Sequence, residues 1–455
     1  MIQSKETNLG KDRVGRLFFA LAVPAITSQV VNALYNMVDR MYIGHIPGSG
    51  ASALTGVGVA FPLIMIISAF AALVSMGGAP RASIMMGKGE NEQANKILGN
   101  CFTALVITAL VLTAFTMIFC EPLLMMFGAS ENTIVYAKAY MMIYAAGTIF
   151  VQLTLGMNAF ISAQGFSRVS MLTVIIGAIT NIVLDPILIF GFNMGVRGAA
   201  LATVLSQAVS TVWVLRFLSG KKSQLKLHPK YFNIDFKILF PALALGVAPF
   251  IMQSTESLLV LCFNSSLLKY GGDLAVGAMT ILSSVMQFSM LPLQGLTQGA
   301  QPIISFNYGA GNIERVKQAF RLLLGCCLVY STTMWLLGMV APQMFAAIFT
   351  SDPALTQITV WALRIYIAAI FLMGAQLACQ QTFIALGNAK ISTFLALLRK
   401  IILLIPLIYI LPNFFENQVF AVFLAEPIAD VISVLTTVIL FFRFFRAVEQ
   451  EQIHA

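Results

Sequence analysis

The residues best suited to chemistry lie in one stretch near the middle of the chain. Between residues 180 and 207, one apolar segment carries Asn181, Asp185 and Pro186, and the next apolar segment carries Thr203. Asn181 and Asp185 are four residues apart, so a helix places them on one face. Proline cannot donate a backbone hydrogen bond, so it bends the helix and leaves a carbonyl free one turn earlier. An amide, a carboxylate and a hydroxyl at similar depth indicate a site for a cation or a proton.

A second carboxylate, Asp39, belongs to the first apolar run and follows Tyr35 by one helical turn. Counting from the ends of the segments places Asp39, Tyr35, Asp185 and Thr203 in one layer. Two carboxylates with neutral oxygens suit a hard monovalent cation such as Na⁺. The same pair suits a proton, because two acids in a pocket of low dielectric do not both ionise readily. The structural alternative for Asp39 is a salt bridge with Arg40.

The composition places the chain among membrane proteins. Of its 455 residues, 59% are hydrophobic and 10% are charged, which is far outside the range of soluble domains. The net charge of +9 does not indicate nucleic-acid binding, because the basic residues lie mostly between apolar runs, where they set orientation in the bilayer. The six cysteines lack CxxC spacing and the three histidines are scattered, so we expect no disulfide, metal centre or other cofactor.

Apolar runs of about twenty residues or more predict an all-α polytopic membrane protein. The twelve predicted spans lie near residues 17–44, 52–80, 97–119, 134–156, 169–192, 196–218, 238–266, 275–304, 319–341, 358–381, 391–413 and 418–442. The polar start of the chain lacks the features of a signal peptide, so the first run is expected to be a true span. A charge at mid-membrane costs roughly 3 kcal/mol, so Asp39 and Asp185 are expected to have a function.

A polar connector with five lysines divides the chain almost in half. The prediction is an N-terminal six-helix lobe over 1–218, a cytoplasmic connector over 219–237 and a C-terminal six-helix lobe over 238–455. Most lysines and arginines fall on the side of the N-terminus, whereas the loops of the other side hold only Lys138, Arg197 and Lys269. This asymmetry predicts a cytoplasmic (inner) membrane protein with both termini in the cytoplasm.

The two lobes repeat at a constant offset of 222 residues. Matching positions include Leu17 and Leu239, Gly77 and Gly299, Pro80 and Pro302, Gly87 and Gly309, and Gly165 and Gly387. Because each lobe holds an even number of spans, the repeats have the same orientation and are related by an axis along the membrane normal. Such an architecture encloses a central cleft between two bundles.

The C-terminal lobe carries a different set of charges, since Asp39 matches Leu261 and Asp185 matches Leu407 at this offset. This set comprises Glu256, Arg399, Lys400, Glu426 and Asp430. In one interpretation, Arg399 or Lys400 pairs with Glu426 or Asp430 to neutralise buried charge. In the other, Glu256 or Glu426 is a counter-charge for cationic substrates or part of a second coupling site. The other candidate residues for a substrate site or second site are Asp430, Gln298, Met252, Met290 and Phe288.

At this point the chain resembles the multidrug and toxic compound extrusion (MATE) family, of the bacterial multidrug efflux type. The resemblance rests on the YNMVDRMYIG run, on the NIVLDPILIFGF and GVRGAALATVLSQ segments, and on the paired G-x-x-P and G-x-G stretches of spans two and eight. It covers the whole chain. It implies a secondary-active exporter of organic cations that exchanges them for Na⁺ or H⁺ by alternating access. It also implies a coupling site at Asp39, Asn181, Asp185 and Thr203, with Tyr35 and Tyr140 beside it.

The expected partners are cationic drugs and the lipid bilayer, and the expected state is a monomer. The nearest rival function is a lipid-linked oligosaccharide flippase of the same superfamily, which requires a wide cationic cleft. The intramembrane acids slightly outnumber the bases here, so this rival stays open. An intramembrane aspartyl protease using Asp39 and Asp185 is a rival from another class, but neither acid has the Gly-x-Gly-Asp or Tyr-Asp context. A channel is the remaining alternative.

Overall fold

The computed structural model describes residues 8–453, and every regular element in this range is a helix. The first group of elements comprises α1 Val14–Gly44, α2 Gly50–Gly87, α3 Asn91–Met126, α4 Ile134–Ala146, α5 Thr148–Ala163, α6 Ser167–Pro186, η1 Ile187–Gly191, α7 Val196–Leu218 and η2 Pro229–Tyr231. The second comprises α8 Phe236–Gly309, α9 Ile313–Val340, α10 Pro342–Phe349, α11 Pro353–Tyr366, α12 Ile370–Ala385, α13 Ala389–Leu397, η3 Leu398–Leu404, α14 Ile405–Ile410, η4 Leu411–Asn413 and α15 Gln418–Ile453.

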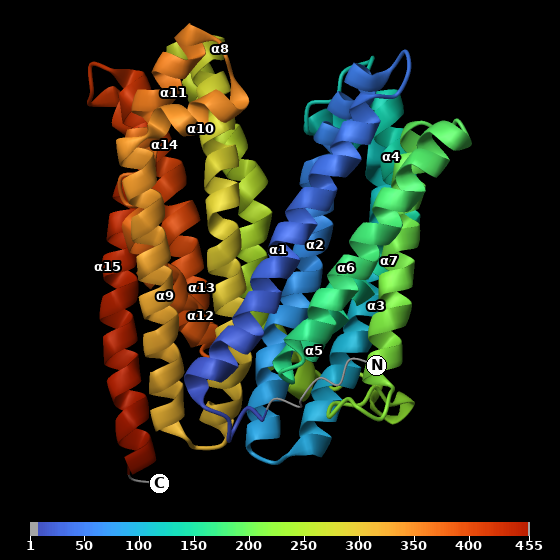
Figure 1. Ribbon diagram of the computed structural model, residues 1–455, viewed down its shortest axis with the longest axis vertical. Helices are drawn as coiled ribbons and strands as arrows, with labels where there is room; N and C mark the ends of the chain where they lie inside the picture. The colour runs from blue at the N-terminus through green and yellow to red at the C-terminus, as the bar shows by residue number, and fades with distance from the viewer. Residues whose placement is uncertain (1–7, 454–455) are drawn as a thin grey trace.

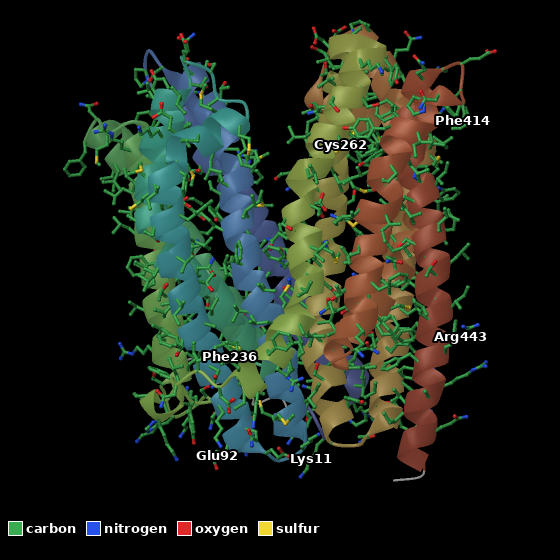
Figure 2. All side chains as sticks on the ribbon, turned by 180° about the vertical axis from the view of Figure 1, so that it is seen from behind. Lys11, Glu92, Phe236, Cys262, Phe414 and Arg443 are labelled. Atoms are coloured by element: carbon green, nitrogen blue, oxygen red, sulfur yellow. The ribbon has the colours of Figure 1, made fainter. Side chains whose placement is uncertain are left out.

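These elements form two bundles that stand side by side (Figure 1). We call α1–α7 the N-terminal bundle and α8–α15 the C-terminal bundle. The bundles lie close together at the end of the molecule where α1 begins and α15 ends, which we call the terminal end, and they diverge towards the opposite end (Figure 1). Lys11 and Glu92 mark the terminal end, and Phe414 lies at the opposite end (Figure 2).

The described part of the chain has nine helices that are long and apolar enough to cross a membrane, or eleven spans when each of two bent pairs is counted as one. One of these, α8, has 74 residues, which is about 110 Å of straight helix, whereas the hydrocarbon core measures about 30 Å. Its backbone leaves helical geometry at Gly272, where φ is 63°. The helix folds back there and contributes two spans (Figure 1). Counted in this way, the spans number twelve, as the sequence predicts.

Two predicted spans are broken rather than continuous. Between α4 and α5 the chain bends by 58° at Gly147, and between α11 and α12 it bends by 47° at residues 367–369. Position 147 matches position 369 at the repeat offset of 222 residues, so both bundles share the break. Neither break contains a proline. The predicted span 196–218 agrees with α7, while α2 and α3 extend well beyond the predicted ends.

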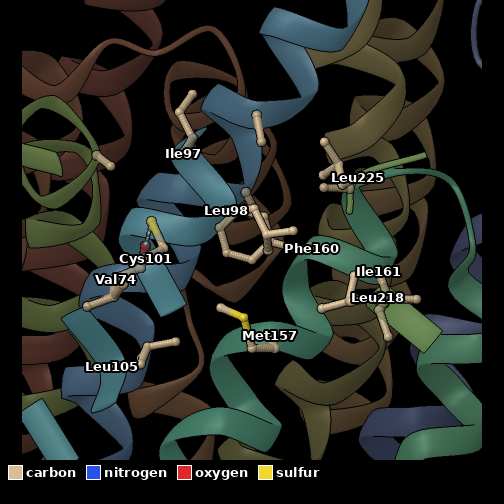
Figure 3. Close-up of a cluster of buried hydrophobic side chains, with 14 of the residues drawn as sticks. Val74, Ile97, Leu98, Cys101, Leu105, Met157, Phe160, Ile161, Leu218 and Leu225 are labelled. Carbon is tan, nitrogen blue, oxygen red and sulfur yellow. Dashed lines mark hydrogen bonds between the residues drawn. The ribbon is translucent and has the colours of Figure 1, made fainter. Parts of the chain in front are cut away.

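Each bundle has its own apolar core. In the N-terminal bundle, Leu98 and Leu105 of α3 pack with Met157 and Phe160 of α5, and all four side chains are buried (Figure 3). Helix α8 contributes Ala242 to the same cluster, so this core continues into the C-terminal bundle. The six cysteines are free and mostly buried among these apolar side chains.

Glycines allow the two bundles to approach closely near the terminal end. A Cβ atom added to Gly77 or Gly87 of α2 would overlap the backbone of α8, and one added to Gly246 or Gly309 of α8 would overlap the backbone of α2. Gly87 faces the carbonyl of Phe306, and Gly309 faces the carbonyl of Ile84 at the equivalent position of the repeat. Backbone contact without intervening side chains is characteristic of small residues at interfaces between membrane helices.

Candidate functional site

The centre of the candidate site is a pair of carboxyl groups from α1 and α6. Asp39 is 9% exposed and Asp185 is fully buried. The two side chains are hydrogen-bonded to each other. A hydrogen bond between two carboxyl groups requires that one of them carries a proton, because an ionised carboxylate only accepts. The structure therefore brings together the two acids that the sequence places in one layer.

Neutral oxygen groups surround this pair. Asn181 donates its amide to Asp185 across 3.4 Å, within one turn of α6. Thr203 of α7 donates to the carbonyl of Ala199 at 3.1 Å and is also hydrogen-bonded to Tyr140 of α4. Tyr35 lies close enough to both carboxyl groups to interact with their charge. All the residues predicted for the coupling site thus converge from four helices.

Several acceptor oxygens at this site have no hydrogen-bond donor within the described part of the chain. They are Oδ1 of Asp39, Oδ1 of Asn181 and Oδ2 of Asp185, and each atom is buried. A buried acceptor without a partner is costly, so acceptors of this kind are normally satisfied by a donor, water or an ion. Two carboxyl oxygens and an amide oxygen are hard ligands, which suit Na⁺ or a proton. Among residues 8–453 no group of three or more His, Cys, Asp or Glu side chains forms a metal site.

The backbone around Asp185 departs from the regular α-helix. Helix α6 ends at Pro186, and the next turn, η1, is a π-helix whose Ile187 carbonyl accepts from Phe192, five residues later. The missing N–H of proline explains why the α-helical ladder does not continue unchanged. Asn193 and Gly195 then take positive φ angles and turn the chain into α7. π-helical turns of this kind often occur at functional sites.

One residue near the carboxyl pair, Tyr144, was not predicted from the sequence. Tyr144 stacks on Tyr140 with ring centroids 6.2 Å apart and is hydrogen-bonded to Ser68 of α2. The spacing of four residues between the two tyrosines signals a shared helix face. Arg40, proposed as an alternative partner of Asp39, is exposed and lies over the ring of Phe61 at 4.8 Å.

The charges of the C-terminal bundle form a second cluster. Arg399 of η3 donates to Asp430 at 2.7 Å and to Glu426 at 3.0 Å, both on α15. Lys400 pairs with Glu256 of α8 and donates to the carbonyl of Met252 at 2.9 Å. Arg399 therefore neutralises buried charge as the first interpretation expects, whereas Lys400 has a different partner. Glu256 differs from the other acids because 64% of its side chain is exposed.

The family assignment follows from a comparison with known families. The MatE family model matches residues 24–187 and 249–410, which include the carboxyl pair and the Glu256–Lys400 pair. The chain belongs to the MatE family. This MATE membership confirms the predicted family and makes the protein a transporter rather than an enzyme.

The MATE relatives match almost the full length of the chain. The multidrug export protein MepA of Staphylococcus haemolyticus is 23% identical over 409 residues, which cover 90% of this chain and 89% of that protein. MepA of Staphylococcus saprophyticus is 22% identical over 432 residues, covering 94% and 95% of the two chains. The similarity is therefore distant in sequence but extends over both bundles.

Solved structures confirm the MATE fold. A crystal structure of a MATE transporter in a bent conformation matches with a TM-score of 0.92 at 22% identity, covering 99% of each chain. An outward-facing conformation of a multidrug resistance MATE transporter matches with a TM-score of 0.90 at 21% identity, covering 98% of this chain and 99% of that chain. A transporter from Pyrococcus furiosus, described as having a binding pocket of reverse polarity, also gives 0.90 at 21% identity, with 99% and 100% coverage.

The remaining predicted residues of this MATE protein, Gln298, Met252, Met290 and Phe288, all lie on α8. Gln298 of α8 is hydrogen-bonded to Gln29 of α1 at 3.2 Å, so it joins the two bundles. The sulfur of Met252 contacts the amide of Gln380 at 3.2 Å. Met290 is half-buried against the apolar cores of the C-terminal bundle, and Phe288 is 45% exposed.

Proposed function

We propose that this MATE protein is a secondary-active multidrug exporter, which extrudes organic cations in exchange for Na⁺ or H⁺. It works in the cytoplasmic membrane with both termini in the cytoplasm, as a monomer whose lobes 1–218 and 238–455 open alternately to the two sides. The export function of the MepA relatives supports this proposal. The arrangement of the bundles also supports it, because they are in contact at the terminal end and diverge at the other (Figure 1).

The observation that carries the proposal is the contact between Asp39 and Asp185, together with their unpartnered oxygens. When a proton or Na⁺ lies between the two carboxyl groups, it cancels one of their two negative charges and holds α1 to α6. When the cation leaves, two negative charges remain in a medium of low dielectric and repel each other. The occupancy of the site therefore changes the force between two helices.

Helix α1 can transmit this force to the contact between the bundles. Its Ala22 and Ile26 pack directly on Gly299 and Gly295 of α8, and Asp39 lies on the same helix. A displacement of α1 at Asp39 therefore changes how α1 meets α8. Coupling between ion and substrate requires a link of this kind, in which one element responds to both sites.

The test replaces each carboxyl group by its amide. We expect Asp39→Asn and Asp185→Asn to express normally and to reduce ethidium accumulation in inverted vesicles to background, because each change removes the charge that couples ion and substrate. An imposed Na⁺ gradient at clamped pH, and then a pH gradient without Na⁺, identify the driving ion. Asp273→Asn, at an exposed position of α8, is the matched control.

Two outcomes contradict the proposal in different ways. Normal transport by both amide variants would show that the coupling site is elsewhere. No accumulation by the parent protein under either gradient would favour the lipid-linked oligosaccharide flippase instead.

A further inference from the structure

Glu256, the exposed acid of the charged cluster, lies on α8 just beyond an aromatic contact between the two bundles. Phe250 of α8 meets Phe70 of α2 edge to face, with centroids 5.0 Å apart. Glu256 follows Phe250 by six residues, which is about 9 Å further along the helix, in the direction in which the bundles diverge (Figure 1). With 64% of its side chain exposed, Glu256 faces away from the packed core.

Lys400, the partner of Glu256, is buried. The Lys400 side chain is 3% exposed, and its ammonium group donates to the Met252 carbonyl and to Glu256. Removal of an ammonium from water is costly unless it is fully paired. Lys400 is therefore a cation that approaches Glu256 from inside the bundle and leaves the outer side of that carboxylate open.

When all five side chains are ionised, the charges of the cluster do not balance. Glu256, Glu426 and Asp430 supply three carboxylates, whereas Arg399 and Lys400 supply two cations. Arg399 is engaged with both Glu426 and Asp430, and Lys400 also interacts electrostatically with Glu426. One added positive charge would give every carboxylate its own cation.

The hydrogen bonds around Lys400 lead to a buried acceptor that has no donor within residues 8–453. From Met252 they continue through Gln380 to Gln376, whose amide donates to Gln380 at 3.4 Å and to Ser433 at 3.2 Å. The side-chain oxygen of Gln376 is buried and has no donor among the described residues. This part of the bundle is thus short of positive charge and of hydrogen-bond donors.

We propose that Lys400 is an internal competitor for the substrate's positive group, and that Glu256 is the counter-charge for which both compete. A cationic substrate that reaches Glu256 from the space between the bundles displaces the ammonium of Lys400. Lys400 then pairs with Glu426, and Arg399 keeps Asp430. This inference rests on the proposed export of organic cations and names the residue that sets their affinity.

The test is direct binding at equilibrium to the purified, detergent-solubilised protein. Ethidium, a monocation, and propidium, its dicationic relative, are titrated while their fluorescence anisotropy is followed. We expect Lys400→Met to bind ethidium about tenfold more tightly than the parent, which corresponds to about 1.4 kcal/mol. Propidium should gain more than ethidium, because Glu256 and the surplus negative charge are then both unopposed. Lys390→Met, at an exposed position of α13, is the control and should leave both affinities unchanged.

A second substitution separates competition from a purely structural role. Glu256→Gln should weaken ethidium binding, and in the double variant the effect of Lys400→Met should disappear, because nothing remains for the lysine to block. If Lys400→Met binds ethidium with unchanged or lower affinity while its melting temperature and gel-filtration profile match the parent, the inference is wrong. If Lys400→Met does not fold, Lys400→Arg replaces it. We then expect weaker ethidium binding, because the arginine fork holds Glu256 more firmly, and unchanged or tighter binding would overturn the inference.

These measurements need no ion gradient, so they are independent of coupling at Asp39 and Asp185. A protein that loses driven export in the amide variants but shows no effect of Lys400→Met supports the proposed function and refutes this inference. A protein that shows the effect of Lys400→Met but no driven export supports this inference and contradicts the proposed function.

Discussion

At the scale of single residues, the two bundles neutralise buried charge in different ways. In the N-terminal bundle two carboxyl groups are hydrogen-bonded to each other, which requires that one of them carries a proton. In the C-terminal bundle the planar guanidinium of Arg399 spans two acids. The first arrangement responds to the supply of a small cation, whereas the second has a cation of its own in the arginine side chain. We therefore propose ion coupling for the first and a structural role for Arg399.

This difference predicts a large cost for removing the arginine. Arg399→Met leaves Glu426 and Asp430 buried and unpaired, so we expect a loss of about 3–5 kcal/mol in the free energy of unfolding. Reversible unfolding in mixed micelles measures this loss. The matched change at the exposed Lys138–Glu121 pair, Glu121→Gln, should leave stability unchanged. Equal stability of Arg399→Met and the parent would contradict the structural assignment.

At the scale of elements, interruptions in the helices occur beside the charged groups. The π-helical turn η1 follows Asp185, and the π-helical segment η3 contains Arg399 and Lys400. Both interruptions lie in the equivalent span of the repeat, the fifth of each bundle. Proline stands next to Asp185 and also next to Glu426. Extra backbone turns and prolines alter the direction of neighbouring side chains, which allows acids inside a helix to face a partner.

The glycine contact between α2 and α8 makes a prediction at this scale. Gly77→Ala inserts a methyl group into the backbone of α8, so we expect it to hold the bundles apart at the terminal end and to abolish export without preventing expression. Spin labels on α3 and α9, each placed at the helix end that lies at the terminal end of the molecule, would report a longer distance between the two bundles. Gly58→Ala on the same helix is the control, since nothing lies within 4 Å of the added Cβ. Unchanged distance and export in Gly77→Ala would contradict the role of this contact.

At the scale of the whole molecule, the start of the chain fastens the N-terminal bundle to the C-terminal one. Arg315 of α9 donates to the carbonyls of Leu9 at 3.0 Å and Asp12 at 2.7 Å. It also donates to Asn307 at 2.9 Å, which in turn donates to Leu9 at 3.0 Å. Residues 8–13 precede α1, so a single guanidinium holds the entrance of the first helix against the other bundle.

We expect Arg315→Gln to release this segment. Amide hydrogen exchange over residues 8–16, measured by mass spectrometry, should become at least several-fold faster, because the Leu9 and Asp12 carbonyls lose a charged donor. Arg321→Gln, at an exposed position on the same helix, should leave the exchange unchanged. If both variants exchange at the parental rate, Arg315 does not hold the segment in place.

Much of the fold could be predicted from the sequence because each span is an apolar run of membrane length. Counting from the ends of the spans also sufficed to place Asp39, Asp185 and Thr203 in one layer, and the spacing of four residues put Asn181 beside Asp185. The bends at 147 and 367–369 could not be predicted, because apolar residues continue through them without a proline. Tertiary packing decides such breaks rather than local preference.

The partner of Lys400 also could not be predicted from the sequence. Arg399 and Lys400 are adjacent, so a helix points them in directions about 100° apart, as 3.6 residues per turn requires. Which of the two faces α15 and which faces α8 depends on the rotation of the segment, and η3 changes that rotation by its π-helical turns. The sequence shows the five charges of this cluster but not how they pair.

The glycine contacts between α2 and α8 have a further consequence for motion. Where side chains interlock, separating two helices exposes cavities, and bringing them together again requires every rotamer to be refitted. At Gly77, Gly87, Gly246 and Gly309 the surfaces that meet are peptide backbone. Such a surface has one shape, loses no rotamer entropy when it closes and is ready to close again after each separation. The contact therefore stabilises the closed state, and it can form again after separation without rearrangement of side chains.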